Sequence, residues 1–344
     1  MTSLDSPSRS EALDRPAGIT WADLLEDLVA QHGTLTQVAW KLVEHADKAK
    51  TELDVASVER ALRRLRTRGQ RDGGAWGQRL VRVFGMPKTI EDRVRWLGLY
   101  HSPFNDLPVA LCLDQLRLWD RPPMSGSRAR LWIHLGFATC ATRTRRLDDA
   151  RTHVARVAEA LAALDSAYDL ARVELVLLDA FLASHDDRAD REVAVASALD
   201  RAAALVPSPA IDAADRACFE ARLVDQRAYQ LNRRDDHAAA LALYQTLPAG
   251  DVHPFASYRR DAGLAYGYFK TGRTADALSL VQRAIAHAGD GGYTRLRAMG
   301  LLMQARITED AALRATSIER ACTIARRLGD DELLVRAGKL RGDA

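Results

Sequence analysis

The feature that most constrains the fold of this 344-residue chain is a pair of positions, twelve residues apart, that recurs along most of its length. Small residues dominate these positions, and they let two helices approach closely. Successive second members lie 40, 44, 46, 37 and 38 residues apart, which is typical of stacked helical hairpins. The pairs are Gly98/Ala110, Ala138/Ala150, Leu182/Ala194, Ala228/Ala240, Ala265/Ala277 and Met303/Ala315.

Apolar periodicity predicts six helical hairpins after residue 88 and a capping helix over 330–342. No segment keeps a period-two alternation of apolar and polar residues, so we expect an all-α fold without a sheet. The region 89–344 is therefore predicted to form one repeat domain. The predicted hairpins cover 89–121, 128–165, 167–206, 212–248, 256–288 and 294–328.

The clearest repeat runs from Leu264 to Ala284 and includes Ala265, Tyr268, Gly272 and Ala277. This order of large, small and aromatic residues, a turn glycine and a second small residue resembles the tetratricopeptide repeat (TPR). The repeats around 182–201 and 302–322 are degenerate. The resemblance implies a TPR-like α-solenoid of about six hairpins, whose first helices line a concave surface that binds a peptide or protein.

Placing each repeat on the TPR pattern assigns individual side chains to that concave surface. Arginine and tyrosine dominate the set, a mixture that suits a peptide segment or an acidic motif. The alternative is that these are ordinary solvated side chains. The predicted partner-binding residues are Arg95, Thr139, Arg143, Arg222, Asp225, Tyr229, Asn232, Arg259, Tyr266, Arg297 and Gln304.

The N-terminal region differs from the repeats in pattern and in charge. Residues 1–18 lack periodicity and are predicted to be a disordered tail, whereas 19–88 are predicted to form four short helices. From Arg60 to Lys88 nine residues are basic and only Asp72 is acidic. The basic charge falls on the third helix and the loop that follows it. Because that helix keeps an apolar stripe, its outer face is free to carry arginines.

Three short helices with a basic third helix resemble the helix-turn-helix domain of the lambda-repressor-like kind. In that resemblance residues 35–42 form the supporting helix and 57–66 the recognition helix, which implies binding to double-stranded DNA. About ten residues, Ala46 to Val55, replace the usual tight turn, and the alternative is a basic surface used for protein contact. The predicted DNA-binding residues are Arg60, Arg63, Arg64, Arg66, Arg68 and Arg71.

The sequence offers no catalytic, metal-binding or cofactor-binding pattern. Paired aspartates such as Asp235-Asp236 and Asp330-Asp331 precede predicted helices, where Asp caps free N–H groups. The four cysteines are far apart, which favours reduced thiols packed between helices in a cytosolic protein. We find no signal segment and no apolar stretch that suits a membrane span. We therefore expect a cytoplasmic protein that is not an enzyme and that uses no metal or cofactor.

A helix-turn-helix joined to such repeats resembles the bacterial RRNPP-type regulators. The resemblance implies a cytosolic transcriptional regulator whose repeat domain senses a peptide or protein and whose DNA-binding domains pair in a homodimer. Those receptors commonly hold the peptide backbone with asparagines, of which this chain has two, Asn105 and Asn232. The net charge of +3 gives no global argument for a polyanionic partner. The alternative is an adaptor that does not bind DNA and assembles a protein complex through its concave face.

Overall fold

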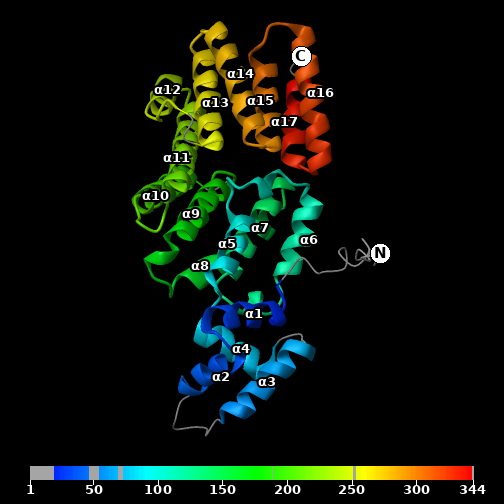
Figure 1. Ribbon diagram of the computed structural model, residues 1–344. Coiled ribbons are helices and arrows are strands. Elements are labelled where there is room, and N and C mark those ends of the chain that lie inside the picture. Colours follow the sequence, from blue (N-terminus) through cyan, green and yellow to red (C-terminus); the bar gives the residue numbers. More distant parts are fainter. Residues whose placement is uncertain (1–18, 46–53, 69–72, 188, 251–252, 343–344) are drawn as a thin grey trace, which may run out of the picture. The chain divides into compact units, whose positions relative to one another are not determined.

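The computed structural model describes residues 19–45, 54–68, 73–187, 189–250 and 253–342 (Figure 1). Within these ranges the chain forms seventeen α-helices and three short 3-10 helices, and no strand. The predicted all-α class is therefore confirmed for the described residues. The tail predicted over residues 1–18 lies outside them.

The chain divides into two compact units. The first consists of residues 1–95 and 114–133, and the second of residues 96–113 and 134–344. We predicted a domain boundary after residue 88, whereas 89–95 and 114–133 group with the N-terminal residues. Three helices contribute residues to both units: α5 (Lys88–Gly98), α6 (Val109–Trp119) and α7 (Arg130–Arg143).

Four short helices open the first unit, within the region 19–88 where four were predicted. A capping box starts the first of them, because Asp23 N–H donates to the Thr20 hydroxyl and Thr20 N–H donates to the Asp23 carboxylate. Leu24, Val38 and Leu62 are fully buried, so the apolar stripes of the first three helices supply the core. The four helices are α1 (Trp21–His32), α2 (Leu35–Glu44), α3 (Val55–Arg68) and α4 (Gly74–Phe84).

The second unit is a series of helix pairs, and most of its helices pack on the next one along the chain. Each predicted hairpin range from residue 128 onward covers all or most of two of these helices. Figure 1 shows α13 to α17 side by side. After α7 the helices are α8 (Leu147–Leu161), α9 (Asp169–Ala183), α10 (Arg191–Leu205), α11 (Ala213–Arg233), α12 (His237–Gln245), α13 (Pro254–Lys270), α14 (Thr274–Asp290), α15 (Thr294–Ile307), α16 (Ala311–Leu328) and α17 (Asp331–Gly342).

The twelve-residue spacing marks buried positions in three of the six hairpins. Both members of the pairs Ala138/Ala150, Ala228/Ala240 and Ala265/Ala277 are at most 1% exposed. Ala110 and Ala315, the second members of the first and last pairs, are exposed. The spacing therefore identifies buried pairs of small residues in the second, fourth and fifth hairpins but not in the other three.

The turn between the two helices has one backbone form in three hairpins. Arg145, Asp235 and Gly272 have φ values of 59°, 59° and 82°, and the second helix starts two residues later. In each turn the following N–H donates to a carbonyl five residues back, as in the bond of 3.0 Å from Asp236 to Leu231. Only glycine adopts this left-handed conformation without a steric cost.

Asp235→Gly should therefore stabilise the fold. The Asp235 side chain is 92% exposed, so its removal costs little packing. We expect the free energy of unfolding to rise by about 0.5–1 kcal/mol, because relief of left-handed strain exceeds the added chain entropy of glycine. The matched variant Asp235→Ala should instead lower it. Urea unfolding measures both variants, and equal destabilisation by the two would contradict this account of the turn.

Candidate functional site

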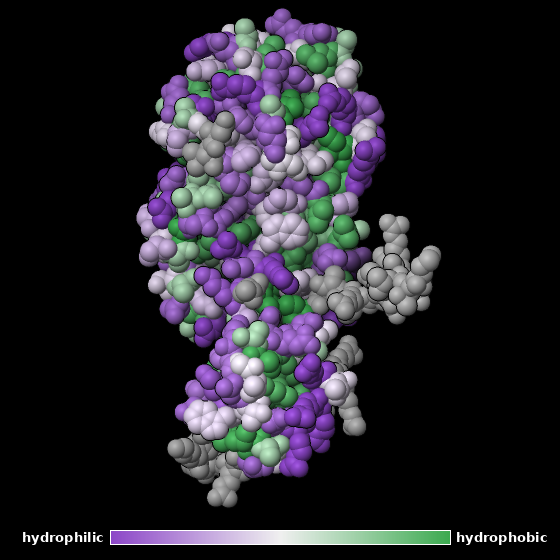
Figure 2. All heavy atoms as spheres, viewed as in Figure 1, coloured by the Kyte–Doolittle hydropathy of each residue, from purple (hydrophilic) through white to green (hydrophobic). Residues whose placement is uncertain are grey.

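Four of the predicted DNA-binding arginines lie on the solvent-exposed face of α3. Arg60 and Arg64 are exposed, and the side chains of Arg63 and Arg66 are 70% and 50% exposed. The opposite face of α3 is buried through its apolar residues. Figure 2 shows hydrophilic residues gathered over α3. Arg68 is the last residue of α3, and Arg71 lies outside the described residues.

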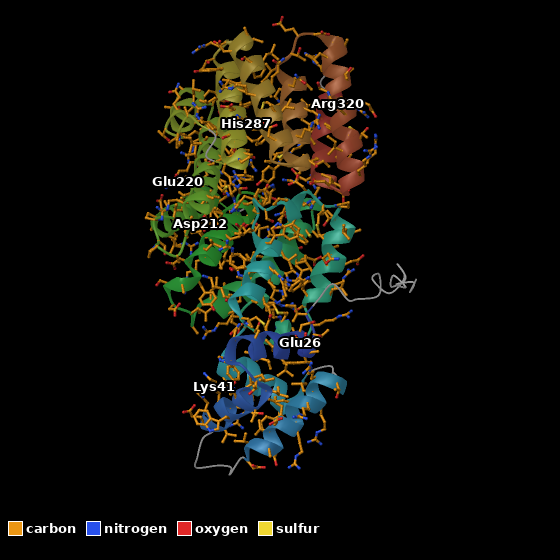
Figure 3. The ribbon with its side chains drawn as sticks, viewed as in Figure 1. Glu26, Lys41, Asp212, Glu220, His287 and Arg320 are labelled. Atoms are coloured by element: carbon orange, nitrogen blue, oxygen red, sulfur yellow. The ribbon has the colours of Figure 1, made fainter. Side chains whose placement is uncertain are left out.

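A hydrogen bond and an ion pair link α3 to its neighbours, and Arg63 and Arg66 each have an acidic partner. The Thr36 hydroxyl of α2 donates to Glu59 (3.0 Å), which also accepts from Arg63 (2.5 Å). Both bonds lower the pKa of Glu59, and the bond from Arg63 has the larger effect. Arg66 lies 3.5 Å from Glu26 on α1, labelled in Figure 3. Among the described residues the Arg64 side chain has no partner, so it is the most available cation on this face.

The predicted partner-binding residues fall into buried and accessible groups. We expected all of them at an open surface, but five are 1–8% exposed because ion pairs or hydrogen bonds within the protein accommodate polar side chains there. The buried group is Thr139, Arg143, Arg222, Arg259 and Gln304. Arg95, Asp225, Asn232 and Tyr266 are partly buried, whereas Tyr229 and Arg297 are exposed.

Four arginines of the second unit converge on the segment 99–107, the chain between α5 and α6. The Tyr100 hydroxyl accepts hydrogen bonds from Arg295 (2.9 Å) and Arg259 (3.3 Å). The Arg222 guanidinium lies 4.7 Å from the centre of the Tyr100 ring, a cation–π contact. Burial alone would raise the pKa of Tyr100, but these three positive charges outweigh it and lower the pKa to about 8.

Each of these arginines also has an acidic partner. Arg222 binds both oxygens of Glu174, at 2.6 and 2.9 Å. Arg259 lies 2.8 Å from Asp225, which also accepts a hydrogen bond from the Tyr244 hydroxyl. Arg295 and Arg143 share the Oδ2 atom of Asp330, at 2.6 and 3.3 Å. The positive charge around Tyr100 is thus compensated inside the fold.

The rest of segment 99–107 is bound at several further points. His101 Nε2 lies 2.7 Å from Asp215 Oδ1, and the Tyr293 hydroxyl donates to the His101 carbonyl (2.9 Å). The Asp106 carboxylate accepts the N–H of Arg295 in the first turn of α15, although burial still raises the pKa of Asp106 to about 6. Arg143 donates to the Leu107 carbonyl (2.9 Å). The segment is therefore held along its whole length.

A cavity of about 440 Å³ lies among α8, α9 and α10. Its charged lining is paired internally: Arg151 binds Asp186, and Arg201 lies 3.3 Å from Asp179. Arg191 donates to the Asp186 carbonyl. These pairs leave the cavity without a converging set of available charges.

The described ranges contain no group of three or more His, Cys, Asp or Glu side chains that could hold a metal ion. None of the helices in them has the length and apolar character that crossing a bilayer requires. All four cysteines are buried, as expected.

Comparison of the chain with family models, curated proteins and solved structures finds no match. The protein is therefore described by its own fold and by two groups of arginines. The structure shows an all-helical protein, over its described residues, in which arginines are exposed on α3 and buried around segment 99–107.

The sequence did not predict the role of segment 99–107, nor the acids that pair with the arginines around it. One signal was present in the sequence, namely the length of the connection. Residues 99–108 join α5 to α6, whereas 271–273 suffice to join α13 to α14. The acids that neutralise the arginines carried no such signal, because Glu174 looks like an ordinary helix residue and Asp330 like a helix-capping aspartate.

The Tyr100 environment gives a pH-dependent prediction. The Tyr100 phenol should lose its proton near pH 8 in the folded protein, since its pKa is lowered to about 8. A lowered pKa means that the folded state favours the phenolate. The stability of the protein relative to Tyr100→Phe should therefore increase as pH rises from about 8 to 10, the usual pKa of tyrosine.

The measurement is the phenolate absorbance of the wild-type protein minus that of Tyr100→Phe, followed as a function of pH. A Tyr229→Phe difference curve is the control, because Tyr229 is 54% exposed. A Tyr100 midpoint at or above 10 would contradict the electrostatic account.

Proposed function

We propose that the protein is a cytoplasmic bacterial transcriptional regulator that binds DNA through a helix-turn-helix-like domain. The observation that carries the proposal is the arginine face of α3. Arg60, Arg63 and Arg64 are exposed there, while the other face of the helix is buried in the core of the N-terminal helices. A rigid helix with one arginine-rich side suits the major groove of DNA.

The intramolecular contacts of these arginines are compatible with DNA binding. The Arg63 side chain is 70% exposed in its pair with Glu59, and an ion pair in such a setting contributes little to stability. A phosphate can therefore take over the Arg63 guanidinium at little cost. Arg64 needs no exchange of partner. Such phosphate contacts would supply most of the affinity, and an arginine that reaches a guanine edge would add specificity.

The helix pairs of the second unit are proposed to be TPR-like and to bind a peptide or protein partner. Tyr229 on α11 is 54% exposed, and Asn232 lies one turn further along the same helix. The His237 ring lies 2.8 Å from the Asn232 oxygen and makes an edge contact with Tyr266. These residues form an accessible aromatic and polar patch, a composition common at interfaces. Regulation requires that the partner favour one conformation of the protein over another.

This patch also supports the second candidate, an adaptor that binds a partner but not DNA. The patch needs no contribution from α3. The two candidates differ in one outcome, since only the regulator requires that the unaltered protein bind duplex DNA at low salt.

Charge reversal on α3 tests the regulator directly. Arg63→Glu, Arg64→Glu and Arg66→Glu together should lower affinity for duplex DNA by more than tenfold at low salt. If each arginine neutralises one phosphate, the loss of three contacts should also reduce the slope of log K against log salt by about 3. Fluorescence anisotropy with labelled promoter DNA measures both quantities.

The matched control reverses three exposed arginines of α16, namely Arg320, Arg326 and Arg327 (Arg320 is labelled in Figure 3). It changes the net charge equally and should leave DNA affinity within twofold to threefold. Equal losses in both variants, or no binding by the unaltered protein, would remove the DNA-binding proposal and leave the adaptor.

A further inference from the structure

The connection between α5 and α6 is longer than a hairpin needs. Residues 144–146, 234–236, 271–273 and 308–310 each close a hairpin of the second unit with three residues. The α5–α6 connection uses residues 99–108. Chain closure therefore accounts for only part of this segment, and its remaining residues are available for another role.

The segment is bound as a peptide ligand would be, group by group. Its phenol, imidazole and carboxylate are each recognised by a different set of groups on α11, α13 and α15. Arg222 and Phe255 contact the Tyr100 ring, and Phe219 and Phe255 contact the His101 ring. Aromatic side chains anchored by arginines, with a carboxylate at a helix N-terminus, are typical of peptide recognition.

The fit between the segment and this surface is incomplete. Among the described residues, two buried polar atoms at the contact have no hydrogen-bond partner: His101 Nδ1 and Arg259 Nε. A buried donor or acceptor without a partner weakens the contact that buries it. A ligand that satisfies Arg259 better could therefore compete with the segment.

We propose that segment 99–107 is an internal ligand of the surface formed by Arg222, Arg259, Arg295 and Asp215, and that a partner peptide displaces it. The partner would present a phenol and a carboxylate about six residues apart, as Tyr100 and Asp106 do. The proposal rests on the partner-binding half of the proposed function and is independent of DNA binding. The chemistry of the partner follows from the segment, because each group of the partner would replace one that the segment now supplies.

Displacement of segment 99–107 would also change contacts outside the surface that it occupies. Arg143 holds the Leu107 carbonyl at the end of the segment and also contacts Asp330 and the Leu328 carbonyl. The departure of the segment thus removes one contact of an arginine that links α7 to the turn between α16 and α17. This provides a route from ligand exchange to the C-terminal helices.

The test supplies the segment in trans. A labelled peptide of residues 98–108 is titrated into the full-length protein and into a full-length variant with Tyr100→Phe and Asp106→Ala. These changes remove two recognised groups of the internal segment and keep its length. The peptide should bind the variant at least tenfold more tightly than the unaltered protein. A control peptide with the same two changes should bind both proteins equally weakly.

Hydrogen exchange on the unaltered protein with excess peptide gives a second measurement, in which the amides of 99–107 should lose protection. Equal binding of the two peptides, or no binding to the folded variant, would overturn the proposal. Loss of cooperative unfolding in the variant would overturn it as well, because the segment would then be an obligatory part of the core. DNA affinity is a separate readout, so failure here is distinct from failure of the regulator proposal.

Discussion

The Asp330 carboxylate organises the buried charges of the second unit. It is fully buried, accepts hydrogen bonds from Arg295 and Arg143, and caps α17 through the N–H of Leu333 (3.0 Å). Burial alone would raise the pKa of Asp330, but these partners, Arg295 foremost, lower it and keep the group ionised. One carboxylate therefore joins α7, α15 and α17. A buried charge that loses its partner costs about 3–5 kcal/mol, which makes the arrangement sensitive to any change in it.

The position of Arg295 follows from this carboxylate, and the position of Tyr100 follows from Arg295. The Arg295 guanidinium donates one N–H to Asp330 and another to the Tyr100 hydroxyl. Arg259 and Arg222 reach the same tyrosine while Asp225 and Glu174 neutralise them. Arg63 and Arg66 of α3 lie in the opposite environment, because they are exposed and held only by surface pairs. Arginines thus hold a buried segment in place in the second unit, whereas in the first unit they are proposed to contact DNA.

The helices could be predicted from sequence because their signals are local. Apolar period, capping residues and turn glycines place the hairpin of α13 and α14 within two residues of its observed outer bounds. The aspartate pairs also had a local meaning, since Asp236 accepts the N–H of Ala239 at the start of α12. Burial of the arginines had no local signal. Arg222 and Glu174 are 48 residues apart, and Arg143 and Asp330 are 187 apart, so periodicity cannot reveal that they meet. A solvated arginine and a buried one look alike in sequence until the acid that neutralises it is known.

The central claim is that arginines of the helix pairs hold segment 99–107 through Tyr100. A double-mutant cycle of Tyr100→Phe and Arg295→Lys measures this most directly, because lysine keeps a charge beside Asp330 while losing the forked geometry. Urea unfolding of the four proteins gives the coupling free energy. The account predicts a coupling of about 1 kcal/mol or more between the two residues. Additivity of the two changes within about 0.3–0.5 kcal/mol would contradict it.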